Sequence, residues 1–377
     1  MVAGVPKETT PGERRVALAP TQVATLAKAG VTVRIEKGAG LASGIPDEQY
    51  EQKGAELVTR EKVFSESDVV LTVRCGAAHA GEKPLPVGKK GQVFIGMADP
   101  WQQHESFKQI ADGGATLFSM ELIPRITRAQ SMDVLSSMAN LAGYKSVLLG
   151  ANSLQKMFPM LMTAAGTIVA ARVFVVGVGV AGLQAIATAR RLGAIVSAYD
   201  VRPAVKEEVK SLGAKFVELD LGEEAEGEGG YAREMDEEFY RKQREMMLDV
   251  VKESDVVITT ASVPGKPAPR LLTEEMVKAM PPGSVVVDLG AERGGNCELT
   301  KPGETVEAHN VTIVGPENVA SSLAGNASQL YSKNITTFLQ NMMKDGELTI
   351  NTEDEIVDAS LVIQDGVVRN ENLKEAE

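Results

Sequence analysis

Three glycines, Gly177, Gly179 and Gly182, have a spacing that suits a close approach between a polypeptide backbone and a phosphate group. They follow the apolar run 173–176 and precede a segment with a helical pattern. In a G-x-G-x-x-G turn the first glycine allows the tight turn, the second admits the pyrophosphate, and the third lets helix and strand pack closely. The N–H groups at the start of the helix would face the anion. The motif therefore predicts a dinucleotide-binding loop.

A carboxylate follows at the distance expected for the ribose-binding residue of such a loop. Asp200 ends the apolar run 194–199 and lies 23 residues after Gly177, close to the usual separation of about 20 residues. It would accept hydrogen bonds from an adenosine ribose and repel a 2′-phosphate, which favours NAD over NADP. Arg202 opposes this preference, because a nearby arginine can accommodate a 2′-phosphate. A glycine-rich turn that binds nothing is the alternative interpretation.

A second group of polar residues opens a long helical pattern at 124–145, which contains two arginines, a glutamine and an aspartate. Thr127 and Gln130 fit a capping box, in which each side chain satisfies a backbone N–H group. The apolar positions with three- and four-residue spacing are Met132, Leu135, Ala139 and Ala142. This period predicts an amphipathic helix from about 128 to 158 that ends near Pro159.

Apolar runs that end in turn residues alternate with helical patterns along the chain. The first series of strands is predicted at 31–38, 68–74, 92–98 and 115–122, with helices at 20–30 and 100–114. The second series is predicted at 172–177, 194–200, 215–219, 255–261, 284–290 and 311–315. The alternation is typical of parallel sheets with helices on both faces. It predicts an α/β protein with two doubly wound Rossmann-like domains joined by long helices.

The two series divide the chain into domains. The first is predicted to contain residues 1–136 plus 326–377, and the second residues 137–325. A second long helix, at 328–343, would return the chain to the first domain. The segment 361–370 is predicted to form a hairpin around an Asp-Gly turn.

Composition narrows the class of protein. The 377 residues are 44% hydrophobic and 24% charged, as in ordinary globular proteins, and the net charge of -12 argues against a nucleic-acid partner. The longest uncharged stretches, 157–171 and 173–189, hold 15 and 17 residues. Both are shorter than the roughly 20 residues of a membrane-spanning helix. We therefore expect no direct insertion into a membrane.

The cysteines indicate neither a disulfide framework nor a metal site. Cys75 and Cys297 are the two cysteines, and the N-terminal residues do not have the pattern of a signal peptide. Cys75 and His79 are a weak pair beside the roughly four ligands of structural zinc. The sequence thus predicts a cytoplasmic protein with no metal site.

With these motifs in place, the chain resembles the alanine dehydrogenase and transhydrogenase family over nearly its whole length. The segments 4–20 and 193–203 are similar to the two signatures of the family. Five further segments are similar to the NAD(H)-binding component of proton-translocating transhydrogenase, which is the first portion of its alpha subunit: 124–144, 158–185, 229–235, 263–277 and 294–304.

The resemblance implies roles for named residues. Arg125 and Gln130 would hold the nicotinamide end of NAD(H), near Asp133 and Ser136, and these four form the predicted catalytic set. The acidic, glycine-rich segment 220–238, which its composition alone predicts to be a solvated loop, would be a mobile loop that closes over the nucleotide. The full predicted cofactor-binding set is Arg125, Ile126, Thr127, Arg128, Gln130, Ser131, Met132, Asp133, Gly177, Val178, Gly179, Val180, Ala181, Gly182, Asp200, Val201, Arg202, Gly230, Tyr231, Gln243, Ala261 and Ser262.

Two departures from the family pattern fall near this set. Ser262 stands where the family usually has leucine, and the segment 315–331 lacks a Pro-x-Arg expected near 320–322.

The activity that the resemblance implies is hydride exchange between NAD(H) on this chain and NADP(H) on a partner subunit. Such a transfer needs proximity and orientation and no general acid or base. Proton translocation would reside in separate membrane-spanning subunits, so this chain would be peripheral at the inner face of the plasma membrane. The resemblance also implies a homodimer.

Two other functions remain open. Alanine dehydrogenase uses a lysine and a histidine for general acid–base chemistry. The corresponding stretches here carry Arg74 in 72–76 and no histidine in 94–102, while His79 and His104 fit ordinary surface positions. A non-catalytic NAD-binding module is the second alternative.

Overall fold

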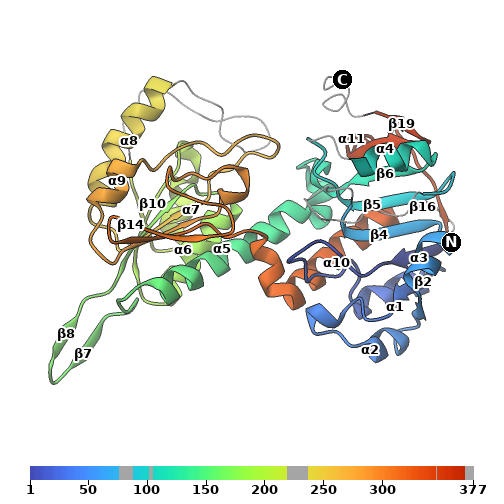
Figure 1. Ribbon diagram of the computed structural model, residues 1–377, viewed down its shortest axis with the longest axis horizontal. Coiled ribbons are helices and arrows are strands. Elements are labelled where there is room, and N and C mark those ends of the chain that lie inside the picture. Colours follow the sequence, from blue (N-terminus) through green and yellow to red (C-terminus); the bar gives the residue numbers. More distant parts are fainter. Residues whose placement is uncertain (76–87, 102–104, 219–236, 345, 370–377) are drawn as a thin grey trace. The chain divides into compact units, whose positions relative to one another are not determined.

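Two sheets built mainly from parallel strands, one in each of two units of the chain, confirm the predicted α/β class (Figure 1). The computed structural model assigns residues 1–138 and 320–377 to unit 1 and residues 139–319 to unit 2. It describes the whole chain except residues 76–87, 102–104, 219–236, 345 and 370–377. The predicted loop at 220–238, with Gly230 and Tyr231, thus lies almost wholly outside the described residues, as do His79 and His104.

Unit 1 contains an eight-stranded sheet in the order β19-β18-β6-β5-β4-β1-β2-β3. Its parallel strands are β1 (Val2–Val5), β2 (Thr32–Glu36), β3 (Glu56–Val58), β4 (Val69–Arg74), β5 (Val93–Met97) and β6 (Thr116–Ser119). The strands β18 (Leu361–Gln364) and β19 (Val367–Val368) form the predicted hairpin, with positive φ at both Asp365 and Gly366. The helices are α1 (Pro20–Lys28), α2 (Asp47–Glu51), α3 (Arg60–Glu66), α4 (Glu105–Asp112), α10 (Ala324–Asn341) and α11 (Glu355–Ser360). A short antiparallel pair, β16 (Met343–Lys344) and β17 (Glu347–Leu348), follows α10.

Unit 2 contains a seven-stranded sheet in the order β11-β10-β9-β12-β13-β15-β14, the strand arrangement of a dinucleotide-binding fold. The strands are β9 (Arg172–Val176), β10 (Ile195–Tyr199), β11 (Lys215–Phe216), β12 (Val256–Thr259), β13 (Val285–Asp288), β14 (Thr305–Ala308) and β15 (Val311–Val314). The helices are α6 (Val180–Arg191), α7 (Lys206–Ser211), α8 (Glu237–Val251) and α9 (Glu274–Ala279), together with most of α5. All six strands predicted in this unit are present, and β14 is an antiparallel strand that the sequence pattern did not predict.

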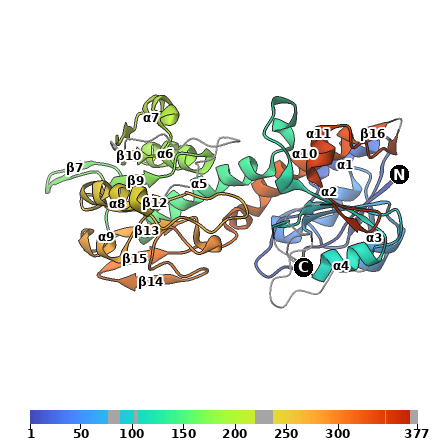
Figure 2. The same ribbon diagram turned by 90° about the horizontal axis from the view of Figure 1, so that it is seen from above.

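Both faces of the unit 2 sheet are covered, which explains why its strands are apolar at consecutive positions. Along β9, Val173 and Val175 pack with residues of α5, α6 and α7, whereas Phe174 and Val176 pack with residues of α8 and α9 (Figure 2). Each side chain of these four is at most 1% exposed. The carboxyl ends of the strands are therefore the open edge on which a ligand can bind.

The predicted helix over 128–158 differs from the structure at both ends. Residues Thr127–Met132 form a 3₁₀ helix, η3, and the α-helix α5 spans Val134–Ser153. Asp133 is the N-cap residue of α5. Its carboxylate accepts hydrogen bonds from the backbone N–H (2.8 Å) and the Oγ (2.6 Å) of Ser136. The capping box of Thr127 and Gln130 is thus wrong, because Ile126 occupies the N-cap position of η3.

The buried side of α5 also differs from the predicted one. Leu135, Ala139 and Ala142 are only half-buried, although Met132 is buried as expected. Close packing occurs instead at Gly143, where a Cβ atom would overlap the carbonyl oxygen of Ala181. The buried side of α5 carries Val134, Met138 and Val147, together with small residues such as Gly143 that add nothing to an apolar periodicity.

The helix α5 ends at Ser153, before the predicted end near 158, and the chain beyond it forms a two-stranded arm. The strands β7 (Leu161–Thr163) and β8 (Gly166–Ile168) pair in an antiparallel hairpin whose side chains are all exposed (Figure 1). The hairpin lies within the uncharged stretch 157–171. Among the described helices, none is both long enough and apolar enough to cross a bilayer.

Serines on and just before α10 hold the segment that joins β1 to α1. Ser321 accepts the N–H of Arg14 (2.7 Å), Ser328 that of Val16 (3.0 Å) and Ser332 that of Ala19 (2.8 Å). These hydroxyls satisfy backbone groups of a segment that forms no strand. They place Glu13 and Arg15 at the carboxyl edge of the unit 1 sheet.

We expect Ser328→Ala to destabilise the protein by about 1–3 kcal/mol, because the buried N–H of Val16 loses its acceptor. Urea unfolding followed by circular dichroism measures the change. Thr337→Ala, which alters an exposed hydroxyl on the same helix, is the matched control and should change stability by no more than about 0.5 kcal/mol. Equal losses in the two variants would contradict the role of the serine contacts.

Candidate nucleotide-binding site

The glycine loop has the geometry that its spacing predicts. Gly177 has φ of 93°, donates its N–H to the carbonyl of Tyr199 (2.9 Å) and accepts a hydrogen bond from Thr260 Oγ1 (2.8 Å). A Cβ atom on Gly182 would overlap the carbonyl oxygen of Gly177, whereas a Cβ atom on Gly179 would meet nothing within 4 Å. The first glycine thus makes the turn, the third permits the packing, and the second leaves open space.

The first turn of α6 is suited to an anion. Its N-cap residue is Gly179, which has no side chain to accept hydrogen bonds from the N–H groups of the helix. These groups need an external partner, and the helix dipole adds partial positive charge at the same place. Val180 and Ala181 are half-buried at this turn, and Val178 is buried beneath it.

Asp200 and Arg202, which we expected to have opposite effects on a ligand, form a close ion pair. Asp200 Oδ1 accepts hydrogen bonds from Arg202 N (2.9 Å) and Nε (2.8 Å), and Oδ2 accepts from Arg202 Nη2 (2.9 Å) and Val178 N (2.6 Å). The side chains of Arg202 and Asp200 are 13% and 6% exposed. The carboxylate therefore ties the carboxyl end of β10 to the glycine loop, and Val201 between the pair is half-buried.

The remaining predicted residues of unit 2 differ in their surroundings. Gln243 is 1% exposed in α8, and its Nε2 donates to the hydroxyl of Tyr199 (3.0 Å), so it packs beneath the edge of the sheet. Ala261 is half-buried and Ser262 exposed, just after β12. Asn296, which the sequence motifs did not single out, donates to the carbonyl of Ala261 (2.8 Å).

In unit 1 the predicted nicotinamide residues cluster around η3. Ile126, Asp133 and Ser136 are half-buried and Met132 is buried, whereas the other five are exposed: Arg125, Thr127, Arg128, Gln130 and Ser131. The structure thus brings these residues together on one short turn. Asp133 and Ser136 bond to each other across the first turn of α5.

Arg128 has a partner within unit 1. Its guanidinium donates to both carboxylate oxygens of Asp354, at 2.5 and 2.9 Å, and these hydrogen bonds hold the pKa of Asp354 well below its usual range. Asn334 of α10 donates to the carbonyl of Ser131 (2.9 Å). Both contacts fasten η3 to distant parts of the chain. Arg128 therefore anchors the turn, a role that its sequence context did not predict.

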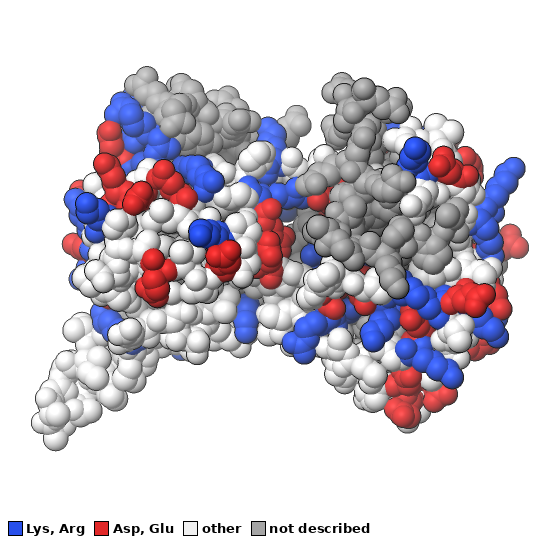
Figure 3. Space-filling view, in the orientation of Figure 1, with Lys and Arg blue, Asp and Glu red and all other residues white. Residues whose placement is uncertain are grey.

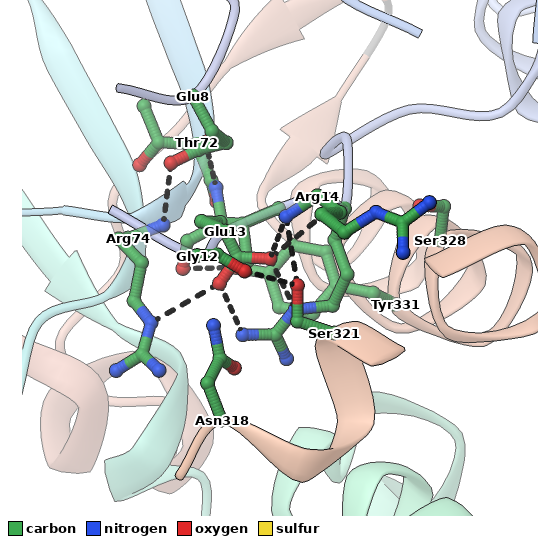
Figure 4. Close-up of polar contacts among 12 residues, drawn as sticks. Glu8, Gly12, Glu13, Arg14, Thr72, Arg74, Asn318, Ser321, Ser328 and Tyr331 are labelled. Carbon is green, nitrogen blue, oxygen red and sulfur yellow. Dashed lines mark hydrogen bonds and ion pairs between the residues drawn. The ribbon is translucent and has the colours of Figure 1, made fainter. Parts of the chain in front are cut away.

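A second polar cluster lies at the carboxyl edge of the unit 1 sheet (Figure 4). The buried Glu13 carboxylate accepts hydrogen bonds from Arg15 Nε (2.8 Å) and Nη2 (2.6 Å) and from Arg74 Nε (3.3 Å). Burial alone would raise the pKa of Glu13, but the hydrogen bonds and charges of the two arginines lower it to about 2. Arg74, the basic residue of the stretch 72–76, is thus engaged by an internal carboxylate.

Among the residues that the structure describes, nothing around either cysteine suits a metal ligand or a nucleophile. Both are buried free thiols, and burial raises the pKa of Cys75 to about 12 and that of Cys297 to about 11. Within the described ranges, no three His, Cys, Asp or Glu side chains are grouped so that they could hold a metal ion.

The sheet order, the glycine loop and the acid after β10 define a Rossmann-type α/β protein. Family models for the alanine dehydrogenase/PNT N-terminal and C-terminal domains match residues 4–142 and 146–371, respectively. The chain belongs to the alanine dehydrogenase/PNT family.

Individual relatives agree with this assignment. The chain is 48% identical over 374 residues to the first portion of the NAD(P) transhydrogenase subunit alpha of Rhodospirillum rubrum, a match that covers 98% of this chain and 97% of the relative. A crystal structure of transhydrogenase from Sinorhizobium meliloti is similar with a TM-score of 0.88, 48% identity and coverage of 98% and 100% of the two chains. A structure of L-alanine dehydrogenase is similar with a TM-score of 0.81, 25% identity and coverage of 100% and 98%.

Alanine substitutions should separate the two roles of the loop glycines. Gly182→Ala should lower stability by about 3 kcal/mol, because its methyl group overlaps a backbone oxygen. Gly179→Ala should leave stability within about 0.5 kcal/mol of wild type. It should nevertheless weaken NADH binding at least tenfold, a loss of about 1.4 kcal/mol, since its methyl group fills the space predicted for the pyrophosphate. Thermal melts and fluorescence titration with NADH measure both quantities, and tight binding by Gly179→Ala would contradict the predicted position.

Proposed function

We propose that this chain is the NAD(H)-binding subunit of a proton-translocating NAD(P) transhydrogenase. In this role it exchanges hydride between its own NAD(H) and NADP(H) held on a partner subunit. The observation that carries the proposal is 48% identity, across 98% of this chain, to a protein named as the first portion of an NAD(P) transhydrogenase subunit alpha. Retention of the complete glycine loop, with open space above Gly179, supports it.

The residues of unit 2 fit the adenosine and pyrophosphate part of NAD(H). In the proposed arrangement the first turn of α6 binds the pyrophosphate, and Asp200 binds the adenosine ribose. Val178, Val180, Ala181, Val201, Ala261 and Ser262 would form the walls around these groups, with Gly230 and Tyr231 contributed from outside the described residues. Gln243 would act through Tyr199, to which its side chain is bonded.

The turn η3 fits the nicotinamide part. Bound nicotinamide supplies the hydride or accepts it, and the protein has to hold the ring in one orientation. We propose that Arg125 and Gln130 bind the carboxamide side of the nicotinamide. Asp133 and Ser136, which are hydrogen-bonded to each other at the cap of α5, would lie along the edge of the ring. None of these side chains has to take up or release a proton, since hydride exchange depends on proximity and alignment.

The proposed partners follow from the same assignment. They are an NADP(H)-binding component and membrane-spanning subunits that conduct protons, with this chain bound to them at the inner face of the plasma membrane. On the visible face of each unit, acidic and basic side chains are interspersed (Figure 3). This surface does not resemble the basic face that nucleic-acid binding requires.

We also propose a homodimer, supported by the β7–β8 arm. The exposed fractions of Met160, Met162 and Val169 are 59%, 72% and 66%, and the arm carries no charged side chain (Figure 3). Exposed apolar patches of this kind mark interaction sites. A second copy of the chain is the proposed occupant.

An experiment with three arms tests the function against its two rivals. The purified chain is mixed with the NADP-binding component, NADH and an NADP⁺ analogue whose reduced form has a separate absorbance. Reduction of the analogue, dependent on both proteins, is the expected result. NADH oxidation by the chain alone with pyruvate and ammonium would indicate an amino-acid dehydrogenase, and NADH binding without either reaction would indicate a non-catalytic module.

Gln130→Asn should separate nicotinamide positioning from nucleotide affinity. The substitution shortens the side chain by one methylene and keeps the amide, so NADH affinity should stay within a few-fold. Hydride exchange should slow by about tenfold or more, equivalent to roughly 1.4 kcal/mol of transition-state positioning. Single-turnover kinetics measure the rate, and Gln52→Asn, at another exposed glutamine, is the control. A wild-type rate for Gln130→Asn would refute the positioning role.

Met162→Asp should disrupt the proposed homodimer. It places a charge on the most exposed apolar residue of the arm and should raise the dimer dissociation constant at least 100-fold, about 2.7 kcal/mol. Sedimentation equilibrium measures the change, and Leu41→Asp, at an exposed apolar residue of unit 1, is the control. A monomeric wild-type protein, or an unaffected Met162→Asp dimer, would contradict the proposal.

A further inference from the structure

The ion pair between Asp200 and Arg202 has a consequence for nucleotide selection, which rests on the proposed function. A carboxylate has about four acceptor positions. In Asp200 they are used by three donors of Arg202 and by the N–H of Val178. Both side chains are mostly buried, so these contacts are shielded from water.

Ribose hydroxyls would need some of the same acceptor positions. A nucleotide that bonds to Asp200 must therefore displace at least part of the Arg202 guanidinium. The Val178 contact comes from the backbone of the glycine loop and can remain. Binding of the ribose diol to this carboxylate would thus require it to exchange with the guanidinium.

A guanidinium separated from Asp200 would be able to bind a phosphate group. Its planar N–H donors bind phosphate in a bidentate manner, whereas a carboxylate repels phosphate. The pair as it stands is neutral overall, so its net charge repels a 2′-phosphate far less than a lone carboxylate would. Rejection of a 2′-phosphate must then depend on keeping the arginine occupied.

We propose that Arg202 is a specificity-determining residue whose phosphate-binding capacity is masked by Asp200. Asp200 then excludes 2′-phosphorylated nucleotides chiefly because it holds the guanidinium. Removal of the carboxylate charge exposes a phosphate-binding arginine, and removal of the arginine leaves a carboxylate that repels phosphate more strongly. The ligand class distinguished here is adenosine nucleotide with or without a 2′-phosphate.

A double-mutant cycle with NADH and NADPH as probes tests the proposal. Calorimetry at one fixed ionic strength gives the ratio of the NADPH to the NADH dissociation constant for wild type, Asp200→Asn, Arg202→Gln and the double variant. We expect Arg202→Gln to raise this ratio about tenfold and Asp200→Asn to lower it by about tenfold or more. The double variant should lose most of the NADPH binding gained by Asp200→Asn.

Controls keep the outcomes distinct. Arg191→Gln makes the same charge change at an exposed position near the end of α6 and should leave the ratio unchanged, and thermal melts show that each variant is folded. If Asp200→Asn does not fold, Arg202→Lys is measured instead. This variant should raise the ratio by a smaller factor than Arg202→Gln, because lysine keeps the positive charge but cannot form the bidentate contact.

Two results would overturn the inference and leave the proposed function standing, provided that the wild type binds NADH and exchanges hydride with the NADP-binding component. These are equal ratios for Asp200→Asn and the double variant, or an unchanged ratio for Arg202→Gln. A wild-type protein that does not bind NADH would overturn both.

Discussion

The carbonyl oxygen of Gly177 faces the α-carbon of Gly182 at a distance that only a glycine permits. This backbone contact sets the start of α6 against the end of β9, and Thr260, which directly follows the neighbouring strand β12, donates a hydrogen bond to the same oxygen. Gly143 of α5 makes a similar approach to the carbonyl of Ala181 in the first turn of α6. The open space over Gly179 and the direction of the first N–H groups of α6 both follow from these close contacts.

Carboxylates that are satisfied by their own neighbours hold loops within each of the two units. Asp288, at the end of β13, is fully buried and accepts hydrogen bonds from Thr259, Gly290, Cys297 and Thr300. Asn296, in the same loop, bonds to the carbonyl of Ala261. Asp133 caps α5, and Glu13 forms ion pairs with two arginines. Buried polar groups stabilise a structure only when they are paired, and here the pairing also fixes the segments proposed to bind the nucleotide.

The sequence was sufficient for the parts of the fold that depend on long apolar runs. Strands such as β9 and β12 are buried on both faces, so nearly every position along them carries an apolar residue. The strands β1 and β3 have four and three residues and β14 lies at a sheet edge, so their patterns are too short or too polar to recognise. The start of α5 was misplaced because Thr127 with Gln130 and Asp133 with Ser136 both have the spacing of a cap, and only the folded chain decides between them.

For the candidate site, the sequence predicted the glycine loop and the acid after β10, since each depends on local geometry. It could not predict partners that come from distant segments. Arg128 and Asp354 are 226 residues apart, and Asn334 reaches Ser131 from another helix. The pairing of Asp200 with Arg202 is local, but residue types alone do not reveal whether two neighbouring charges repel a ligand or bind each other.

Transfer of an isotopic label tests the central claim most directly. NADH that carries deuterium on the transferable position of nicotinamide is mixed with this chain, the NADP-binding component and NADP⁺, and the NADPH formed is analysed by mass spectrometry. Direct exchange between two nicotinamides predicts that NADPH acquires the deuterium without dilution by solvent hydrogen. NADPH without the label, or no NADPH with both proteins present and both nucleotides bound, would contradict the claim.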